Sequence, residues 1–328
     1  YVGQGRVAQT GRLYGQVGSG RYRYASHGRF VHILDLKRRI VIETPLILAW
    51  PLITAQLLIF GTATFALVTG SWQIPSRDGS ADSLVVLWRG VALVILIISP
   101  LRFLSVAAGM ANSTLREVIP FVPQIVRETF AGRVWAWRLG IAAMLAAAAW
   151  IPSRRMLPIL MSTISTLLLI CQSLTSHAVD KGGSAIAIHF AHQVAAGLWL
   201  GALAGLLIGA TYGGASAEWL GWATGRVSKI AGWSVAGLVV TGAIRAWYAI
   251  GLHFDLLLYS LYGRTLLWKL ATAGAVILIG GYNRYRLVPA LGERSARATL
   301  IRNVTAECLL LGAVLGWSAL LTNTPPPH

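Results

Sequence analysis

Long apolar runs separated by short polar connections occupy this chain from about residue 44 onward. The hydrocarbon core of a bilayer is about 30 Å thick and a helix rises about 1.5 Å per residue, so each crossing needs roughly 20 mostly apolar residues. The pattern predicts eight such crossings, near residues 44–69, 84–110, 134–151, 156–175, 185–212, 230–251, 265–282 and 304–322. The expected fold is an all-α integral membrane protein, a bundle of about eight transmembrane helices.

Composition agrees with that interpretation, because 55% of the 328 residues are hydrophobic and only 12% are charged. The net charge of +17 raises the alternative of a nucleic-acid-binding protein. The basic residues, however, are divided among an N-terminal segment, the short connections and a few positions inside the apolar runs. Membrane orientation explains this distribution better, so the lipid bilayer is the expected partner and no nucleic acid is expected.

The first 42 residues differ from the rest, being rich in Gly, Arg and Tyr and lacking a long apolar period. We expect a basic tail at 1–42 and a transmembrane domain at 43–328. Cytoplasmic loops usually carry the excess of Lys and Arg. Counting the connections on this basis favours an outward N-terminus, against which Lys37, Arg38 and Arg39 argue. Eight crossings would then return the C-terminus to the same, outer side.

Three of the seven histidines lie just before or inside the fifth apolar run. Imidazole is costly among lipid tails, so an intramembrane histidine is a functional-site candidate. His189 and His192 are three residues apart and share one face of a helix, and His177 at the preceding helix end would complete a three-nitrogen set. Such ligands suit copper, zinc, iron or nickel. The sequence therefore predicts a metal site near the outer side.

Further polar residues are expected at the same depth. Met110 closes the second run and Asp180 follows His177, so both are candidate additional ligands. Arg245 and Lys269, in the sixth and seventh runs, would repel a metal ion unless a carboxylate offsets them, or they would hold an anionic ligand instead. The remaining polar residues expected there are His253 and Asp255.

Glycine recurs every four residues on the opposite side of the fifth run, at Gly197, Gly201, Gly205 and Gly209. A ridge of small residues lets a neighbouring helix backbone approach closely, which predicts a central position for this helix. Elsewhere the chain has no glycine-rich phosphate loop, nucleophile elbow or HExxH pattern, and only eleven acidic residues. No enzymatic activity is expected.

Four stretches carry a resemblance to a known family. They are HQVAAGLWLGAL from His192, RVSKIAGWSVAGLVVTGAIRAW from Arg226, YGRTLLWKLATAGAVILIGGYNRYRLVPAL from Tyr262, and ECLLLGAVLGWSALLTNTPPP from Glu307. Together they resemble the copper resistance protein D family. The resemblance extends from about residue 45 to the end and is strongest after His177.

The resemblance implies an eight-helix protein of the bacterial cytoplasmic membrane that handles copper ions, taking them from a periplasmic copper carrier and passing them inward or to a cuproenzyme. His177, His192, Lys269 and Asn283 match residues of the family pattern. Three positions depart from it: His189 replaces an aspartate, Arg245 an asparagine, and Gln56 the histidine of the first span. A chain of successive family ligands is therefore incomplete, whereas a single outer site is expected.

Two other functions fit the same residues. Intramembrane histidines can ligate haem, which would make the protein an electron-transfer subunit. Alternatively, the protein is a non-catalytic scaffold subunit of a larger membrane complex. In that case the tail and the segment at 113–134 would make contacts, because Pro120 and Pro123 break this segment into short pieces with an apolar side.

Overall fold

A computed structural model describes residues 27–70, 80–212, 217–251 and 255–324. The chain divides into two units, Tyr1–Ile40 and Val41–His328. The structural account below concerns the second unit. The first 26 residues of the predicted tail lie outside the described residues, as does His253.

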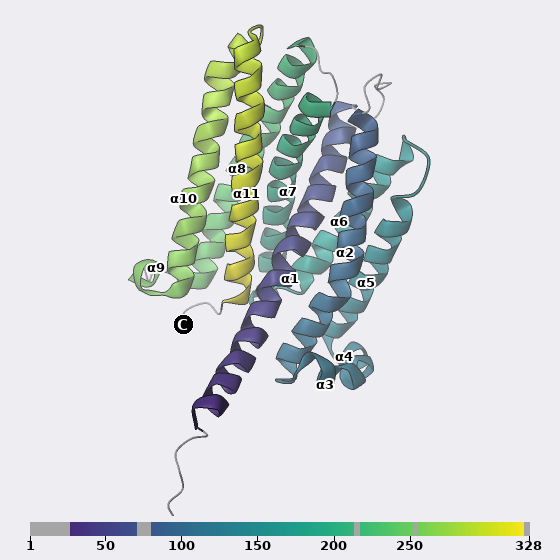
Figure 1. Cartoon of the computed structure of the whole chain (residues 1–328), viewed down its shortest axis with the longest axis vertical. Coiled ribbons are helices and arrows are strands. Elements are labelled where there is room, and N and C mark those ends of the chain that lie inside the picture. The colour runs from purple at the N-terminus through teal and green to yellow at the C-terminus, as the bar shows by residue number, and fades with distance from the viewer. Residues whose placement is uncertain (1–26, 71–79, 213–216, 252–254, 325–328) are drawn as a thin grey trace, which may run out of the picture. The chain divides into compact units, whose positions relative to one another are not determined.

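Most of the described residues are helical and none of them forms a strand, which confirms the prediction of an all-α membrane protein. Eleven α-helices are present in this part of the chain (Figure 1). They are α1 (His27–Thr69), α2 (Ser80–Met110), α3 (Leu115–Val118), α4 (Val122–Glu128), α5 (Phe130–Ala148), α6 (Met156–Leu174), α7 (Gly183–Tyr212), α8 (Ala217–Ile250), α9 (Asp255–Tyr259), α10 (Leu261–Tyr282) and α11 (Arg294–Asn323).

Within the described ranges, seven helices are long and apolar enough to cross a membrane: α1, α2, α6, α7, α8, α10 and α11. The eighth predicted crossing, at 134–151, is not among them. It corresponds to α5, which is helical and packs between α2 and α6 but carries Arg133 and Arg138. These two charges lower the hydropathy of a helix only 19 residues long.

Arg138 is buried in the bundle, with 1% of its surface exposed. Its Nη2 donates to Oε1 of Gln56 on α1 at 3.1 Å, and its guanidinium lies over the ring of Trp135, 4.5 Å from the centroid. Nε of Arg138 and Nε2 of Gln56 have no hydrogen-bond partner. The guanidinium group of Arg138 is thus stabilised by the side-chain amide of Gln56 and by the ring of Trp135.

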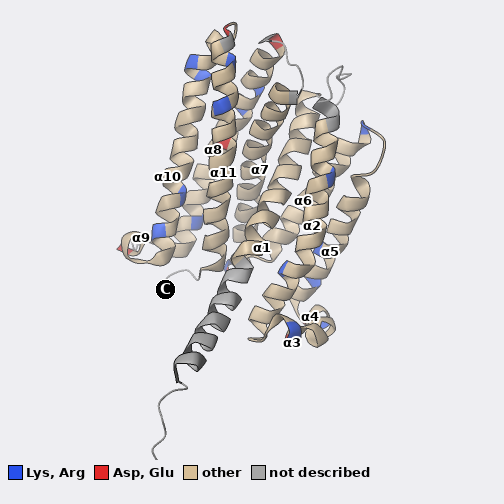
Figure 2. Ribbon diagram, viewed as in Figure 1, with Lys and Arg blue, Asp and Glu red and all other residues tan. Residues whose placement is uncertain are grey.

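Helices α8 and α11 extend well beyond the N-terminal ends of their predicted apolar runs. The run at 230–251 lies in α8, which starts at Ala217, and the run at 304–322 lies in α11, which starts at Arg294. The added turns carry basic residues; Arg226, for example, reaches over the ring of Trp222 at 5.0 Å. Long basic side chains can leave the hydrocarbon while their helix continues. Figure 2 shows Lys and Arg gathered near helix ends, with long uncharged stretches between them.

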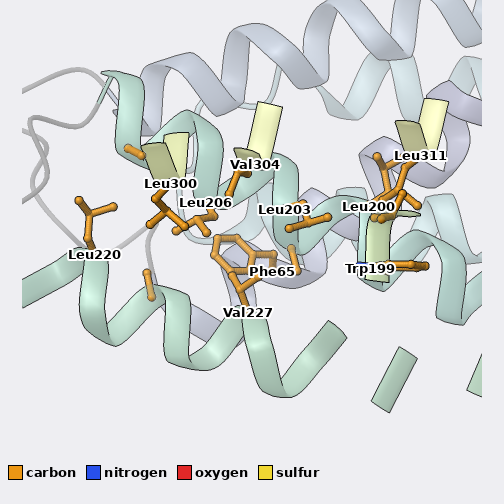
Figure 3. Close-up of a cluster of buried hydrophobic side chains, with 14 of the residues drawn as sticks. Phe65, Trp199, Leu200, Leu203, Leu206, Leu220, Val227, Leu300, Val304 and Leu311 are labelled. Atoms are coloured by element: carbon orange, nitrogen blue, oxygen red, sulfur yellow. The ribbon is translucent and has the colours of Figure 1, made fainter. Parts of the chain in front are cut away.

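Helix α7 is central, as the glycine pattern predicts, and packs against α8, α11, α6 and α2. Its buried Trp199, Leu203 and Leu206 belong to the largest apolar cluster. Figure 3 shows side chains from α1, α7, α8 and α11 meeting there. Trp199 therefore packs in the core below His192 on the same helical stripe.

Helices α1 and α7 touch backbone to backbone. A Cβ atom on Gly61 would overlap the carbonyl oxygen of Gly197, and one on Gly201 would overlap the backbone of Gly61. Further along α7, a Cβ on Gly205 would overlap the ring of Phe65. Only glycine permits this approach, so the ridge on α7 fixes its distance from α1.

The segment between α2 and α5 forms α3, the short 3-10 helix η1 (Ile119–Phe121) and α4. Thr114 and Glu117 form a capping box at the start of α3. Val118 is fully buried, and Val122 packs with it against α2 and α5. One side of the segment thus packs on the helices, while Ile119 and Phe121 are exposed.

We expect Gly201→Ala to destabilise the protein by about 1–3 kcal/mol, because the added methyl group meets backbone atoms that cannot rotate away. Thermal unfolding of the purified protein, followed by tryptophan fluorescence, would measure the loss. Gly140→Ala on α5 is the matched control, since its Cβ would have nothing within 4 Å. Equal melting of the two variants would contradict the close contact.

Candidate metal centre

His189 and His192 lie in the first turns of α7 and are both half-buried. Their rings have different partners. Nδ1 of His189 lies 2.7 Å from Oγ of Ser176, in the connection between α6 and α7. Nδ1 of His192 lies 2.9 Å from Oγ1 of Thr241, on α8.

The partners of Thr241 determine which ring nitrogen of His192 carries hydrogen. Oγ1 of Thr241 donates its only proton to the carbonyl oxygen of Gly237 at 2.6 Å. It therefore accepts from His192, whose Nδ1 must bear a hydrogen. In the neutral ring the lone pair is then on Nε2.

Ser176 acts in the same way on His189. Its hydroxyl donates to the carbonyl oxygen of Ser173 at 2.8 Å and accepts from the backbone N–H of Ala178. His189 therefore also donates through Nδ1. Among the described residues, Nε2 of neither histidine has a hydrogen-bond partner, so two imidazole lone pairs remain available one helical turn apart.

Two cations share the surroundings of these rings. Arg245 on α8 and Lys269 on α10 are both half-buried, and their charges act on His189 and His192. Among the described residues, Tyr262 on α10 interacts electrostatically with Arg245. Within the part of the chain that the structure describes, no carboxylate contributes to the electrostatics of Arg245 or Lys269. The site combines nitrogen donors with positive charge that no described carboxylate offsets.

The other predicted ligands are exposed. His177 and Asp180 lie on the 3-10 helix η2 (His177–Lys181), and Met110 ends α2 with 56% of its surface exposed. Asp255, at the start of α9, is exposed as well.

The predicted three-nitrogen set is not assembled. The described residues contain no group of three or more His, Cys, Asp or Glu side chains that could hold one metal ion. Ser176 and His177 are neighbours in the chain, and it is Ser176 that bonds to α7 while His177 remains exposed. His192 is meanwhile bound to α8. The structure therefore leaves a pair of histidines rather than a triad.

Sequence reasoning did not find Ser176 and Thr241, the two hydroxyls that orient the rings. One signal for Thr241 was present, because it precedes Arg245 by one turn and so shares its face of the helix. A further clamp was also missed: Nε2 of Gln193 donates to Oγ of Ser173 at 2.9 Å and ties α7 to α6 beside the site.

Comparison with known proteins supplies the family. The model for the copper resistance protein D-like N-terminal domain matches residues 44–187, and the model for copper resistance protein D matches residues 222–321. The chain belongs to the copper resistance protein D family. This confirms the resemblance noted in the sequence.

Two curated relatives of this copper resistance protein D family member span most of its length. Copper resistance protein D of Pseudomonas syringae pv. tomato is 26% identical over 308 residues, covering 85% of this chain and 97% of the relative. Inner membrane protein YebZ of Escherichia coli (strain K12) is 27% identical over 255 residues, covering 75% of this chain and 84% of the relative. No solved structure matches the chain.

The two family matches flank the candidate centre. His177 falls in the first, and Thr241, Arg245 and Lys269 fall in the second. His189 and His192 lie between them, in α7. Within this copper resistance protein D family member, the ring-orienting and charged residues of α8 and α10 are therefore in matched sequence, whereas the two candidate ligands are outside it.

The hydrogen bonds predict the histidine tautomers. Nitrogen NMR of protein labelled at histidine should show hydrogen on Nδ1 and none on Nε2 for both His189 and His192. Thr241→Val removes the acceptor of His192 alone and should change only that ring. Thr272→Val is the control, because this exposed hydroxyl bonds only within α10. A ring of His192 with hydrogen on Nε2 alone would contradict the arrangement.

Proposed function

We propose that the protein handles copper ions at the bacterial inner membrane, with His189 and His192 as the ligands of the transported or delivered ion. One observation carries the proposal: both rings are fixed through Nδ1 to hydroxyl oxygens and leave Nε2 without a partner. In metal sites, a ligating histidine ordinarily donates its other ring N–H to an acceptor that sets its orientation. The family membership supports copper as the metal.

A pair of imidazoles leaves an ion with open coordination positions. Such a site suits an ion that arrives with a donor still attached and leaves to another donor, as exchange with a periplasmic carrier or a cuproenzyme requires. His177, Asp180 and Met110 are exposed rather than packed beside the pair. We assign them no part in holding the ion once it is bound by His189 and His192.

Arg245 and Lys269 oppose tight retention of the ion. Like charges disfavour a cation in a partly desolvated site, and no described carboxylate offsets them. The balance of two donors against two positive charges favours brief occupancy over storage. It also favours copper(I), which brings one positive charge fewer than copper(II).

Haem binding is the second candidate, and the same two cations are what favours it. Free imidazole nitrogens beside Arg245 and Lys269 would offer an axial ligand together with partners for the carboxylates of a haem. A visible absorption spectrum of the purified protein separates the two functions. An intense haem band that disappears in His192→Ala would replace the copper proposal.

We expect His189→Ala and His192→Ala each to weaken copper(I) binding by more than about 100-fold, since loss of an outer-shell partner alone typically costs about 10–100-fold. Thr241→Val should weaken copper(I) binding by about 10–100-fold, because it removes only such an outer-shell partner. Competition titrations of the detergent-solubilised protein against a copper(I) chelator would measure the affinities.

His177→Ala is the matched control and should bind copper(I) as the wild type does. If His177→Ala lost as much copper(I) affinity as His192→Ala, η2 would supply a third ligand. Unchanged affinity in both His189→Ala and His192→Ala would reject the site.

Lys269→Gln should tighten copper(I) binding by about ten-fold, equivalent to about 1.4 kcal/mol, because it removes a like charge while keeping a side chain of similar length. The same chelator titration measures the change in affinity. Raising the salt concentration should shift the affinities of wild type and variant little, since partly buried charges are poorly screened. Weaker binding in Lys269→Gln would mean that the ammonium group positions the ion or its anionic partner.

A further inference from the structure

Helix α11 carries a buried carboxylic acid far from the histidine pair. Glu307 is only 3% exposed and lies inside the membrane-crossing stretch Ser295–Asn323. Ionisable side chains at such positions are costly, and in membrane proteins they commonly mark proton or ion pathways. Neither the family comparison nor the histidine site gives Glu307 a role.

The carboxyl group is held by a directed chain of amides. Nδ2 of Asn283 donates to Oε1 of Glu307 at 2.6 Å, and Nδ2 of Asn303 donates to Oδ1 of Asn283 at 2.7 Å. Both donors point towards the acid. Because amide N–H groups donate to a carboxylate and equally to a carboxylic acid carbonyl, this chain can hold Oε1 in either protonation state.

A local change of helical register presents Asn283. It begins the π-helix η3 (Asn283–Leu287), directly after α10, and is 4% exposed. Single π-turns of this kind are frequent at functional sites. On the preceding turn, a Cβ on Gly280 would lie 3.2 Å from Oε2 of Glu307. With Oε1 occupied by Asn283, a proton would be carried by Oε2, beside this glycine.

The neighbourhood of Glu307 contains little other charge. The thiol of Cys308, next to it in the chain, is the titratable group that shares its electrostatics among the described residues. From α7, the core cluster presents apolar side chains such as Leu203 and Leu206. On the side of η3, Arg284 donates to Oγ of Ser228 on α8 at 2.7 Å, and Arg302 on α11 is exposed.

We propose that Glu307 is a proton-exchange site, whose Oε2 takes up and releases a proton while Asn283 holds Oε1. The site is separate from the metal centre, because Asn283 and Lys269 are fourteen residues apart along α10 and η3, about 21 Å by helical rise. Asn303 is half-buried and lies one turn nearer to the start of α11, so the amide chain extends from that end of the helix to the acid.

Infrared difference spectroscopy of the full-length protein in lipid vesicles tests the proposal. Exchange between acidic and alkaline buffer should remove a carboxylic acid C=O band, and the band should shift in heavy water. Glu307→Gln retains an oxygen that accepts from Asn283 and should lack this band. Glu293→Gln is the matched control, because Glu293 is an exposed acid at the start of the same helix, and it should retain the band.

Asn283→Ala provides a second measurement with Glu307 in place, and it should shift the pH midpoint of the band. A titrating band that persists unchanged in Glu307→Gln would overturn the proposal. The proposal would also be overturned if every acid band that changes between the two buffers in the wild type were unaffected by Glu307→Gln and Asn283→Ala. Neither result depends on copper binding, so the test stands apart from that of the histidine pair.

Discussion

The contact of α1 with α7 through glycine is the constraint on which the rest of this membrane domain depends. Gly61 meets Gly197 and Gly201 with no side chain between the two backbones. This contact lies on the glycine side of α7. The opposite side is then left to α6 and α8, and it is there that His189 finds Ser176 and His192 finds Thr241. The ridge of small residues thus decides where the imidazoles can go.

Helical periodicity was sufficient to predict the two faces of α7, because glycines every four residues and histidines three apart are properties of one continuous helix. It was not sufficient to predict the partners of those faces. The bond from His192 to Thr241 joins residues 49 positions apart, and the inward turn of Ser176 in place of His177 depends on a short 3-10 helix. Local pattern predicted a helix at α5 but not how Arg138 is buried, since that burial rests on contacts with another helix.

Two separate groups of polar side chains lie along α10. One contains Lys269 with Arg245 and the histidines, and is rich in positive charge without a described carboxylate. The other contains Asn283 with Glu307, and is a carboxyl group bonded to neutral amides. Between them α10 presents apolar residues, Val276 among them, to the core. Because the two groups are separated by about 21 Å by helical rise, each has only a weak electrostatic influence on the charge state of the other.

Arg138 has a consequence for how the polypeptide enters the membrane. An arginine at the centre of a helix costs about 2.5–3.5 kcal/mol during insertion. Its compensation comes in part from Gln56, which belongs to a helix made much earlier in synthesis, and in part from Trp135 of α5 itself. Insertion of α5 would therefore cost less with α1 already in place, and the order of these helices along the chain suits the burial of that charge.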